Sequence, residues 1–172
     1  MWMDEGLDTG DILLQERVAI APEDDTATLG ARLAEIGGDL LVRTVDALAA
    51  GTLERRRQSD ANATIAPKLV PGDRRLAWTE EAAALERRVR ALAPEPGALT
   101  RFRGRSLKVL RARVRANASG AEPATIVPAD GLVVAAGRGA LELLEVSPEG
   151  RRRMAGAAFA RGARIAPGER MG

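Results

Sequence analysis

The feature that most constrains the fold of this chain is an acidic segment with two glycines. An apolar run follows it directly. Residues 3–15 read MDEGLDTGDILLQ, with four acidic residues around two glycines. Glycine lets the backbone turn through positive φ, and an Asp beside it can accept hydrogen bonds from amides of its own loop. The pattern predicts a strand end, a tight loop and a second strand over residues 11–20. A carboxylate held on such a loop could orient a base or a water.

The chain has neither cysteine nor histidine. Disulfides, thiolate nucleophiles and Cys-ligated zinc are therefore excluded, and no transition-metal site is expected. No apolar run reaches the length of about 20 residues that a membrane helix needs, and the acidic start is untypical of a signal or transit peptide. These features predict a soluble, cytoplasmic protein without a metal or a membrane partner, and we expect a monomer.

Charge is divided unequally along the chain. Residues 1–50 carry a net charge of −8 and residues 51–172 one of +10, and 24 of the 26 basic residues are arginine. Such asymmetry favours a basic module that binds a polyanion. The alternative is solvated surface in a protein that uses arginine heavily.

Apolar spacing predicts helices in the acidic part of the chain. One helix is expected from about residue 26, with a break at Gly37-Gly38 and a second helical stretch over 39–50. Gly51 suits the C-terminal cap of that second stretch.

The basic part of the chain has a different pattern. Residues 51–78 are predicted to be an irregular connector. A helix is expected over 79–92, with Ala82, Leu85, Val89 and Leu92 on one apolar face. Short strands are then expected at 99–102, 107–114, 125–127, 132–136 and 140–146, followed by a helical turn at 154–161. Five short strands fit a small barrel of the oligonucleotide-binding type or an open sandwich.

Four motifs resemble the folate-dependent formyltransferases, and among them the methionyl-tRNA formyltransferases. The loop Asp8-Thr9-Gly10 is similar to the Asp-x-Gly signature of that family. The other ordered matches are Ala66-Pro67-Lys68-Leu69 with Leu76-Ala77-Trp78 after it, residues 87–98, and residues 148–162. The resemblance covers essentially the whole chain.

This resemblance implies a fold class and a domain organisation. The fold would be an α/β fragment, the end of a Rossmann-like formyltransferase domain, followed by a small β-barrel, OB-like C-terminal domain. Residues 1–50 would end the catalytic domain, 51–78 would form the connector and 79–172 the barrel domain.

The resemblance also implies a reaction. Family members transfer a formyl group from the co-substrate 10-formyltetrahydrofolate to the amino group of initiator methionyl-tRNA, and Asp8 stands where the family has an aspartate that holds a His and a water. The family's Asn and His lie upstream of this loop, and this chain begins seven residues before Asp8. We therefore expect the C-terminal part of a longer enzyme, inactive alone. The alternatives are a non-catalytic tRNA-binding fragment, a sugar-nucleotide formyltransferase or a formyl-folate hydrolase.

Clusters of basic residues are the candidate tRNA contacts. Two arginine trios, at 101–105 and 111–115, have the period-two spacing that would put each trio on one face of a strand. Two adjacent strands would then form a basic stripe, and the two runs of three arginines could neutralise phosphates. The predicted tRNA-binding residues are Arg55, Arg56, Arg57, Lys68, Arg101, Arg103, Arg105, Arg111, Arg113, Arg115, Arg151, Arg152 and Arg153.

Overall fold

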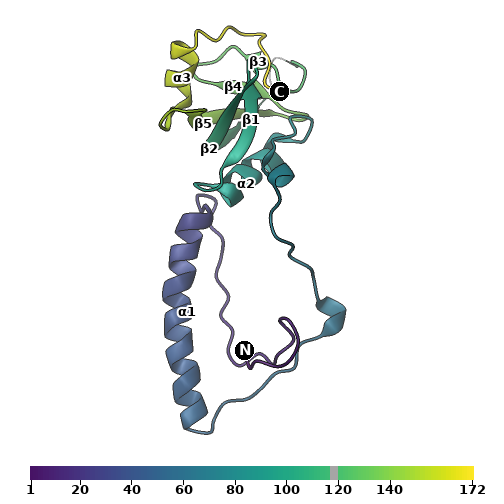
Figure 1. Ribbon diagram of the computed structural model, residues 1–172, viewed down its shortest axis with the longest axis vertical. Coiled ribbons are helices and arrows are strands. Elements are labelled where there is room, and N and C mark those ends of the chain that lie inside the picture. Colours follow the sequence, from purple (N-terminus) through teal and green to yellow (C-terminus); the bar gives the residue numbers. More distant parts are fainter. Residues whose placement is uncertain (117–119) are drawn as a thin grey trace. The chain divides into compact units, whose positions relative to one another are not determined.

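The polypeptide divides into two units. The computed structural model describes residues 1–116 and 120–172 (Figure 1). The N-terminal unit comprises Met1–Asp24 and Thr28–Lys68, and the C-terminal unit comprises Asp25–Ala27 and Leu69–Gly172. The predicted domain boundaries at 50 and 78 stay a prediction.

The C-terminal unit is built on one antiparallel sheet (Figure 1). The strand order is β1-β2-β5-β4-β3, and β6 pairs with β5. The five predicted strands are confirmed to within one to two residues at each end, whereas the short β6 was not predicted. The elements are η2 (Pro71–Arg74), α2 (Ala82–Leu92), β1 (Ala98–Phe102), β2 (Arg105–Arg115), β3 (Ile126–Val127), β4 (Val133–Ala135), β5 (Ala140–Pro148), β6 (Met154–Ala155) and α3 (Gly156–Gly162).

The end of the chain joins the two edges of this sheet. The Gly172 N–H donates to the Arg101 carbonyl of β1 at 3.0 Å, and the Ile126 N–H of β3 donates to the Glu169 carbonyl at 2.7 Å. Because β1 and β3 are the edge strands, the last residues satisfy backbone groups that an open sheet would leave unpaired. The curled sheet is consistent with a small barrel-like domain.

The core of the C-terminal unit lies between α2 and the sheet. The apolar face predicted for the helix is confirmed, since Leu85 and Val89 are fully buried. They belong to one buried cluster with β2 and β5 side chains such as Leu107 and Leu141. Burying each such side chain contributes roughly 1.5–3 kcal/mol, so this unit has a core of its own.

The N-terminal unit contains all of α1 (Thr26–Ala49) except its first two residues, and no residue of this helix is buried. The predicted break at Gly37-Gly38 is wrong, because α1 continues through both glycines. A mid-helix glycine costs about 1 kcal/mol relative to alanine, which a long helix tolerates. The predicted cap at Gly51 is confirmed: Gly51 has φ +68°, and the Thr52 N–H donates to the Ala47 carbonyl at 3.0 Å.

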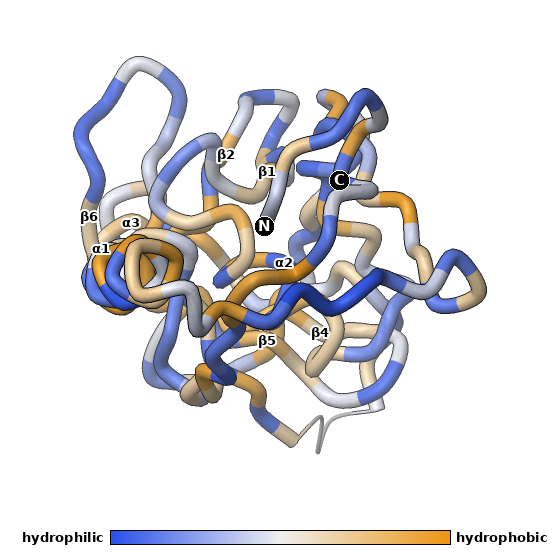
Figure 2. The backbone as a smooth tube through the Cα atoms, turned by 90° about the horizontal axis from the view of Figure 1, so that it is seen from below, coloured by the Kyte–Doolittle hydropathy of each residue, from blue (hydrophilic) through white to orange (hydrophobic). Residues whose placement is uncertain are grey.

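Viewed from below, α1 shows hydrophobic and hydrophilic residues around its axis (Figure 2). Several apolar side chains of this helix are more than 45% exposed, among them Leu41, Val42 and Val45. The N-terminal unit therefore lacks, within its described residues, the packing that holds the C-terminal unit together.

The strand predicted over residues 11–20 is also wrong. Within that range only Ile12 pairs, in an isolated antiparallel bridge with Arg56. A strand forms only where a partner accepts and donates its backbone hydrogen bonds, and the described chain offers this segment one such position.

Candidate functional site

The acidic loop at residues 4–11 is closed by its own polar groups. The Trp2 N–H donates to the Asp11 carbonyl at 2.8 Å. Asp4 Oδ1 accepts a bond from the Gly6 N–H at 3.1 Å and one from the Thr9 hydroxyl at 2.6 Å. The expected hydrogen bonding of an Asp to its own loop is therefore confirmed for Asp4.

Asp8 lies at the turn of this loop. Its φ is +58°, a left-handed value that is unfavourable for a residue with a Cβ, and the residue is exposed. Two residues later, Gly10 is buried, and a Cβ at that position would lie 1.7 Å from the Trp2 carbonyl oxygen. The Asp-x-Gly spacing is thus explained physically: the glycine admits the close backbone approach, and the aspartate presents a carboxylate to solvent.

Three residues of the connector contact the segment that bears this loop, and we call them the connector clasp: Arg55, Arg56 and Gln58. Arg56 and Ile12 exchange both backbone hydrogen bonds, at 2.8 and 2.9 Å. The Arg55 guanidinium lies over the Trp2 ring at 3.7 Å from its centroid. Gln58 donates to two loop carbonyls. Gln58 could not be recognised from the sequence, since a single glutamine in an irregular stretch belongs to no periodic pattern.

Two of the arginines predicted to contact tRNA thus have side-chain contacts within the N-terminal unit. Arg55 stacks on Trp2, and the Arg56 side chain donates to Gln15 Oε1 at 2.7 Å. Arg57 and Lys68, by contrast, are exposed. Their contact with RNA stays a prediction.

On β2, two of the three alternating arginines share one carboxylate. Glu142 Oε2 of β5 lies 2.7 Å from Arg113 Nη2 and 2.7 Å from Arg115 Nε. Burial raises the pKa of Glu142, but the hydrogen bonds and positive charges of the two arginines outweigh burial, so the pKa lies below its ordinary value. The predicted common face of Arg113 and Arg115 is confirmed, and the single carboxylate offsets one of the two positive charges there. Arg111 lies opposite Glu145 in the register of β2 and β5.

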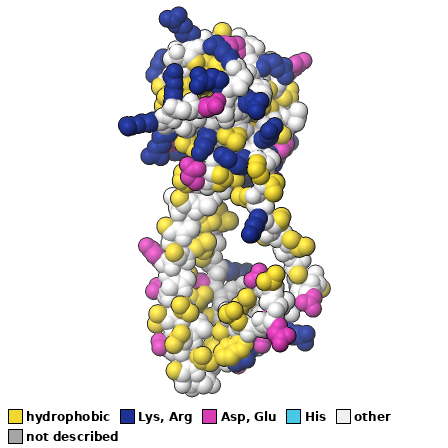
Figure 3. All heavy atoms as spheres, viewed as in Figure 1, with side chains coloured by type: hydrophobic (Ala, Val, Ile, Leu, Met, Phe, Trp, Pro, Cys, Tyr) yellow, Lys and Arg dark blue, Asp and Glu magenta, His cyan; other side chains and the backbone are white. Residues whose placement is uncertain are grey.

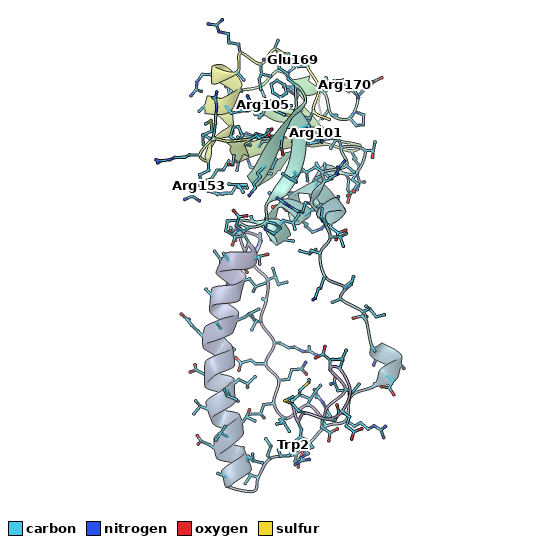
Figure 4. The ribbon with its side chains drawn as sticks, in the orientation of Figure 1. Trp2, Arg101, Arg105, Arg153, Glu169 and Arg170 are labelled. Atoms are coloured by element: carbon cyan, nitrogen blue, oxygen red, sulfur yellow. The ribbon has the colours of Figure 1, made fainter. Side chains whose placement is uncertain are left out.

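The other predicted trio does not lie on one face. β1 ends at Phe102, and Arg103 (φ +48°) and Gly104 (φ +76°) form the turn to β2. Arg101 is paired with Ser106, and Phe102 with Arg105. Because successive strand residues point to opposite faces, Arg101 and Arg105 lie on opposite faces of this hairpin (Figure 4).

Arg103 is held by a carboxylate near the end of the chain. Its guanidinium makes two hydrogen bonds of 2.8 Å to Glu169. These bonds, with one from the Ala166 N–H, hold the pKa of Glu169 below its ordinary value. Arg103 thus stabilises the segment that joins the sheet edges.

The three arginines at 151–153 are all exposed. Arg151 and Arg152 line an open groove of about 520 Å³ together with Arg74, Lys108, Ser147 and the carboxylate-bearing Glu149. Arg153 instead lies 3.4 Å from Glu145 Oε1. Figure 3 shows Lys and Arg side chains spread over the visible face of the C-terminal unit, but these contacts divide the arginines into paired and solvent-facing groups.

Two further features of the described residues bear on the site. No helix among them is long and apolar enough to cross a membrane. Nor do residues 1–116 and 120–172 contain a group of His, Cys, Asp and Glu side chains arranged to hold a metal ion.

Comparison with known proteins identifies two matching family profiles. A profile described as "Formyl transferase, C-terminal domain" matches residues 68–164, and one described as "Formyl transferase" matches residues 1–45.

Curated relatives named methionyl-tRNA formyltransferase match the chain over nearly its whole length. The relative from Solibacter usitatus is 47% identical over 172 residues, which are 100% of this chain and 55% of the relative. The one from Heliobacterium modesticaldum is 42% identical, over 100% of this chain and 58% of its own length. The one from Myxococcus xanthus is 44% identical over 98% of this chain and 54% of the relative. The chain therefore spans about half the length of these relatives.

Solved structures of HypX from Aquifex aeolicus share the fold. One matches with a TM-score of 0.67 and 16% identity, over 91% of this chain and 29% of HypX. Another, in complex with tetrahydrofolic acid, matches with a TM-score of 0.66 and 15% identity, over 91% of this chain and 28% of HypX.

Proposed function

Because this chain belongs to the formyl transferase family, we propose that it takes part in formyl transfer to the amino group of initiator methionyl-tRNA. The formyl donor is 10-formyltetrahydrofolate, and the reaction takes place in the cytoplasm, in a polypeptide of the relatives' full length. The observation that carries the proposal is the 47% identity to a methionyl-tRNA formyltransferase over all 172 residues.

Asp8 is the residue of this chain that takes part in the chemistry. The amine of the aminoacyl-tRNA attacks the formyl carbon, and its proton must leave as the new amide forms. The resemblance implies that a His moves this proton and that the Asp carboxylate holds the His and a water. This chain contains no histidine, so the His comes from elsewhere in the polypeptide. The exposed carboxylate on a loop fixed by Asp4, Gly10 and Gln58 suits the role of Asp8.

The C-terminal unit supplies an RNA-binding surface on an OB-like barrel. An arginine that is paired with a carboxylate must give up that partner before it can bind a phosphate, and so the arginines that face solvent make the RNA contacts. Arg151 and Arg152 line an open groove of about 520 Å³. Phosphate contacts of this kind supply affinity without reading sequence.

The catalytic proposal is tested by replacing the matching residues of the Solibacter relative with residues 1–172 of this chain. The hybrid should formylate methionyl-tRNA, and Asp8→Asn should lower kcat by about 10²-fold or more, the range that positioned acid–base groups contribute. Glu5→Gln, which removes one charge from the same loop, is the matched control and should leave kcat unchanged. An active Asp8→Asn hybrid would refute the role of Asp8. A hybrid that binds tRNA but transfers no formyl group would favour the non-catalytic tRNA-binding alternative.

The RNA proposal is tested by titrating tRNA onto residues 1–172 at several salt concentrations. Each phosphate contact contributes roughly 0.7–0.9 to the slope of log affinity against log salt. Changing Arg151 and Arg152 together to Ala should lower the affinity and reduce the slope accordingly. The control changes Arg138 and Arg170, which pair with Glu81 and Glu122, and removes the same charge. Equal effects of the two double variants would mean that net charge alone governs binding.

A further inference from the structure

The Gln58 side chain makes two short hydrogen bonds to the loop that carries Asp8. Its Nε2 lies 2.7 Å from the Asp8 carbonyl oxygen and 2.7 Å from the Gly10 carbonyl oxygen. A side-chain amide nitrogen carries two hydrogens, so each carbonyl receives one. Both partners are oxygens that only accept, which fixes the orientation of the amide: the nitrogen must face the loop.

These two bonds set the direction of the Asp8–Thr9 and Gly10–Asp11 peptide planes. The Asp8 carbonyl belongs to the residue whose φ is +58°, a conformation that the loop must hold against its intrinsic preference. The Gly10 carbonyl follows the position where a Cβ would meet the Trp2 backbone. Holding both carbonyls therefore holds the backbone that directs the Asp8 side chain.

The rest of the connector clasp brings Gln58 to this place. Arg56 and Ile12 form a two-bond backbone bridge two residues before Gln58. Arg55 stacks on Trp2, which is labelled in Figure 4 and whose own N–H closes the loop on Asp11. Three nearly consecutive connector residues thus contact the start of the chain, 44 to 53 residues away in sequence.

We propose that Gln58 is a positioning residue for catalysis, which acts by holding the backbone of Asp8 in its left-handed conformation. This inference rests on the proposed role of Asp8 in formyl transfer. It gives the connector a part in the chemistry, in addition to linking two parts of the chain.

The test is a double-mutant cycle in the hybrid enzyme. Gln58→Met keeps the length of the side chain but removes both donors, and it should lower kcat about tenfold, equivalent to about 1.4 kcal/mol, while KM for tRNA stays within about twofold. Because Gln58 acts through Asp8, the double variant with Asp8→Asn should be no slower than Asp8→Asn alone. Gln15→Met is the matched control: Gln15 is the only other glutamine of the chain, and its side chain accepts from Arg56 at 2.7 Å without touching the loop.

The outcomes separate this inference from the proposed function. If Asp8→Asn keeps full activity, the role of Asp8 is refuted and this inference with it. If Asp8→Asn is slow but Gln58→Met matches Gln15→Met, only the positioning role is overturned. If the two losses multiply in the double variant, Gln58 does not act through Asp8, and the inference is again overturned.

A second measurement does not depend on activity. Hydrogen exchange of residues 1–172 reports how often the loop opens. The amides of residues 6–12 should exchange several-fold faster in Gln58→Met than in wild type or Gln15→Met, while the amides of β5 stay unchanged. Unchanged exchange in the loop would mean that Gln58 does not hold it and would overturn the inference.

Discussion

Replacing Glu142 with Gln should destabilise the C-terminal unit through the loss of one shared charge. Glu142 is 7% exposed, and its Oε2 accepts bonds from Arg113 and Arg115. Hydrogen bonds to a charged group contribute about 1.5–3 kcal/mol each. The two arginines are 54% and 49% exposed, so solvent screens much of the charge–charge attraction, and Gln can still accept one bond. We expect a loss of about 1–2 kcal/mol in the free energy of unfolding.

The effect should depend on pH with a definite sign. Since the pKa of Glu142 is lower in the folded state than in the unfolded state, the unfolded chain binds the proton more readily. The stabilisation is therefore fully present above the ordinary value of 4.5 and is lost as the pH falls through the folded pKa. The difference between wild type and Glu142→Gln should shrink as the pH is lowered from above 4.5 through the folded pKa of Glu142.

Tryptophan fluorescence during urea unfolding measures this difference. The chain has two tryptophans, and Trp2→Phe leaves Trp78, which is 6% exposed and donates to the Thr100 hydroxyl at 3.0 Å. Trp78 then reports on the C-terminal unit alone. At a typical slope of about 1–2 kcal/mol per M for this size, the midpoint should fall by about 0.5–2 M.

The control is Glu122→Gln, in an ion pair whose carboxylate side chain is 81% exposed. Exposed pairs contribute about 0–1 kcal/mol, so this variant should resemble wild type. Equal midpoints for Glu142→Gln and Glu122→Gln, or a difference that persists at low pH, would refute the reasoning.

Three further variants, two of them with a matched control variant, test the packing and the helix start. Leu85→Ala, at a fully buried position, should lower the free energy of unfolding by about 2–5 kcal/mol, whereas Val114→Ala, at a 44% exposed position, should change it by less than about 0.5 kcal/mol; Trp78 fluorescence measures both. Gly137→Ala places a Cβ 1.9 Å from the Thr79 carbonyl oxygen and should cost about 1–3 kcal/mol, whereas Gly162→Ala meets open space and should be nearly neutral in the same assay. The hydrogen bond from Arg32 holds the pKa of Asp24 below its ordinary value, so Asp24→Asn should reduce the circular-dichroism signal of α1 near neutral pH, and the difference from wild type should vanish as the pH falls through the folded pKa of Asp24.

Features that depend on local spacing were predictable from the sequence. The apolar face of α2 follows helical periodicity, and Leu85 and Val89 are buried as expected. Glycines stand between successive strands of the C-terminal unit, and among them Gly104 and Gly139 adopt positive φ. Features of this kind are determined by residues that lie within a few positions of one another, so the local sequence pattern predicts them.

Features that depend on distant partners were not predictable. Arg103 reaches Glu169, 66 residues away, and Gln58 reaches Asp8, 50 residues away; no spacing rule links such pairs. The strand predicted at 11–20 failed for the same reason, because a strand requires a partner that the local pattern does not specify.

Ion pairing changes what the basic charge of residues 51–172 means for RNA binding. Counterion release depends on the cations that reach phosphate, and an arginine held by a carboxylate must first lose that partner. To bind a phosphate, Arg113 and Arg115 would have to give up their hydrogen bonds to the nearly buried Glu142. The carboxylate of Glu142 would then face the RNA without these two partners. Arg151 and Arg152 face no such cost. The salt slope of tRNA binding should therefore reflect the solvent-facing arginines and fall well below the value that a net charge of +10 would suggest.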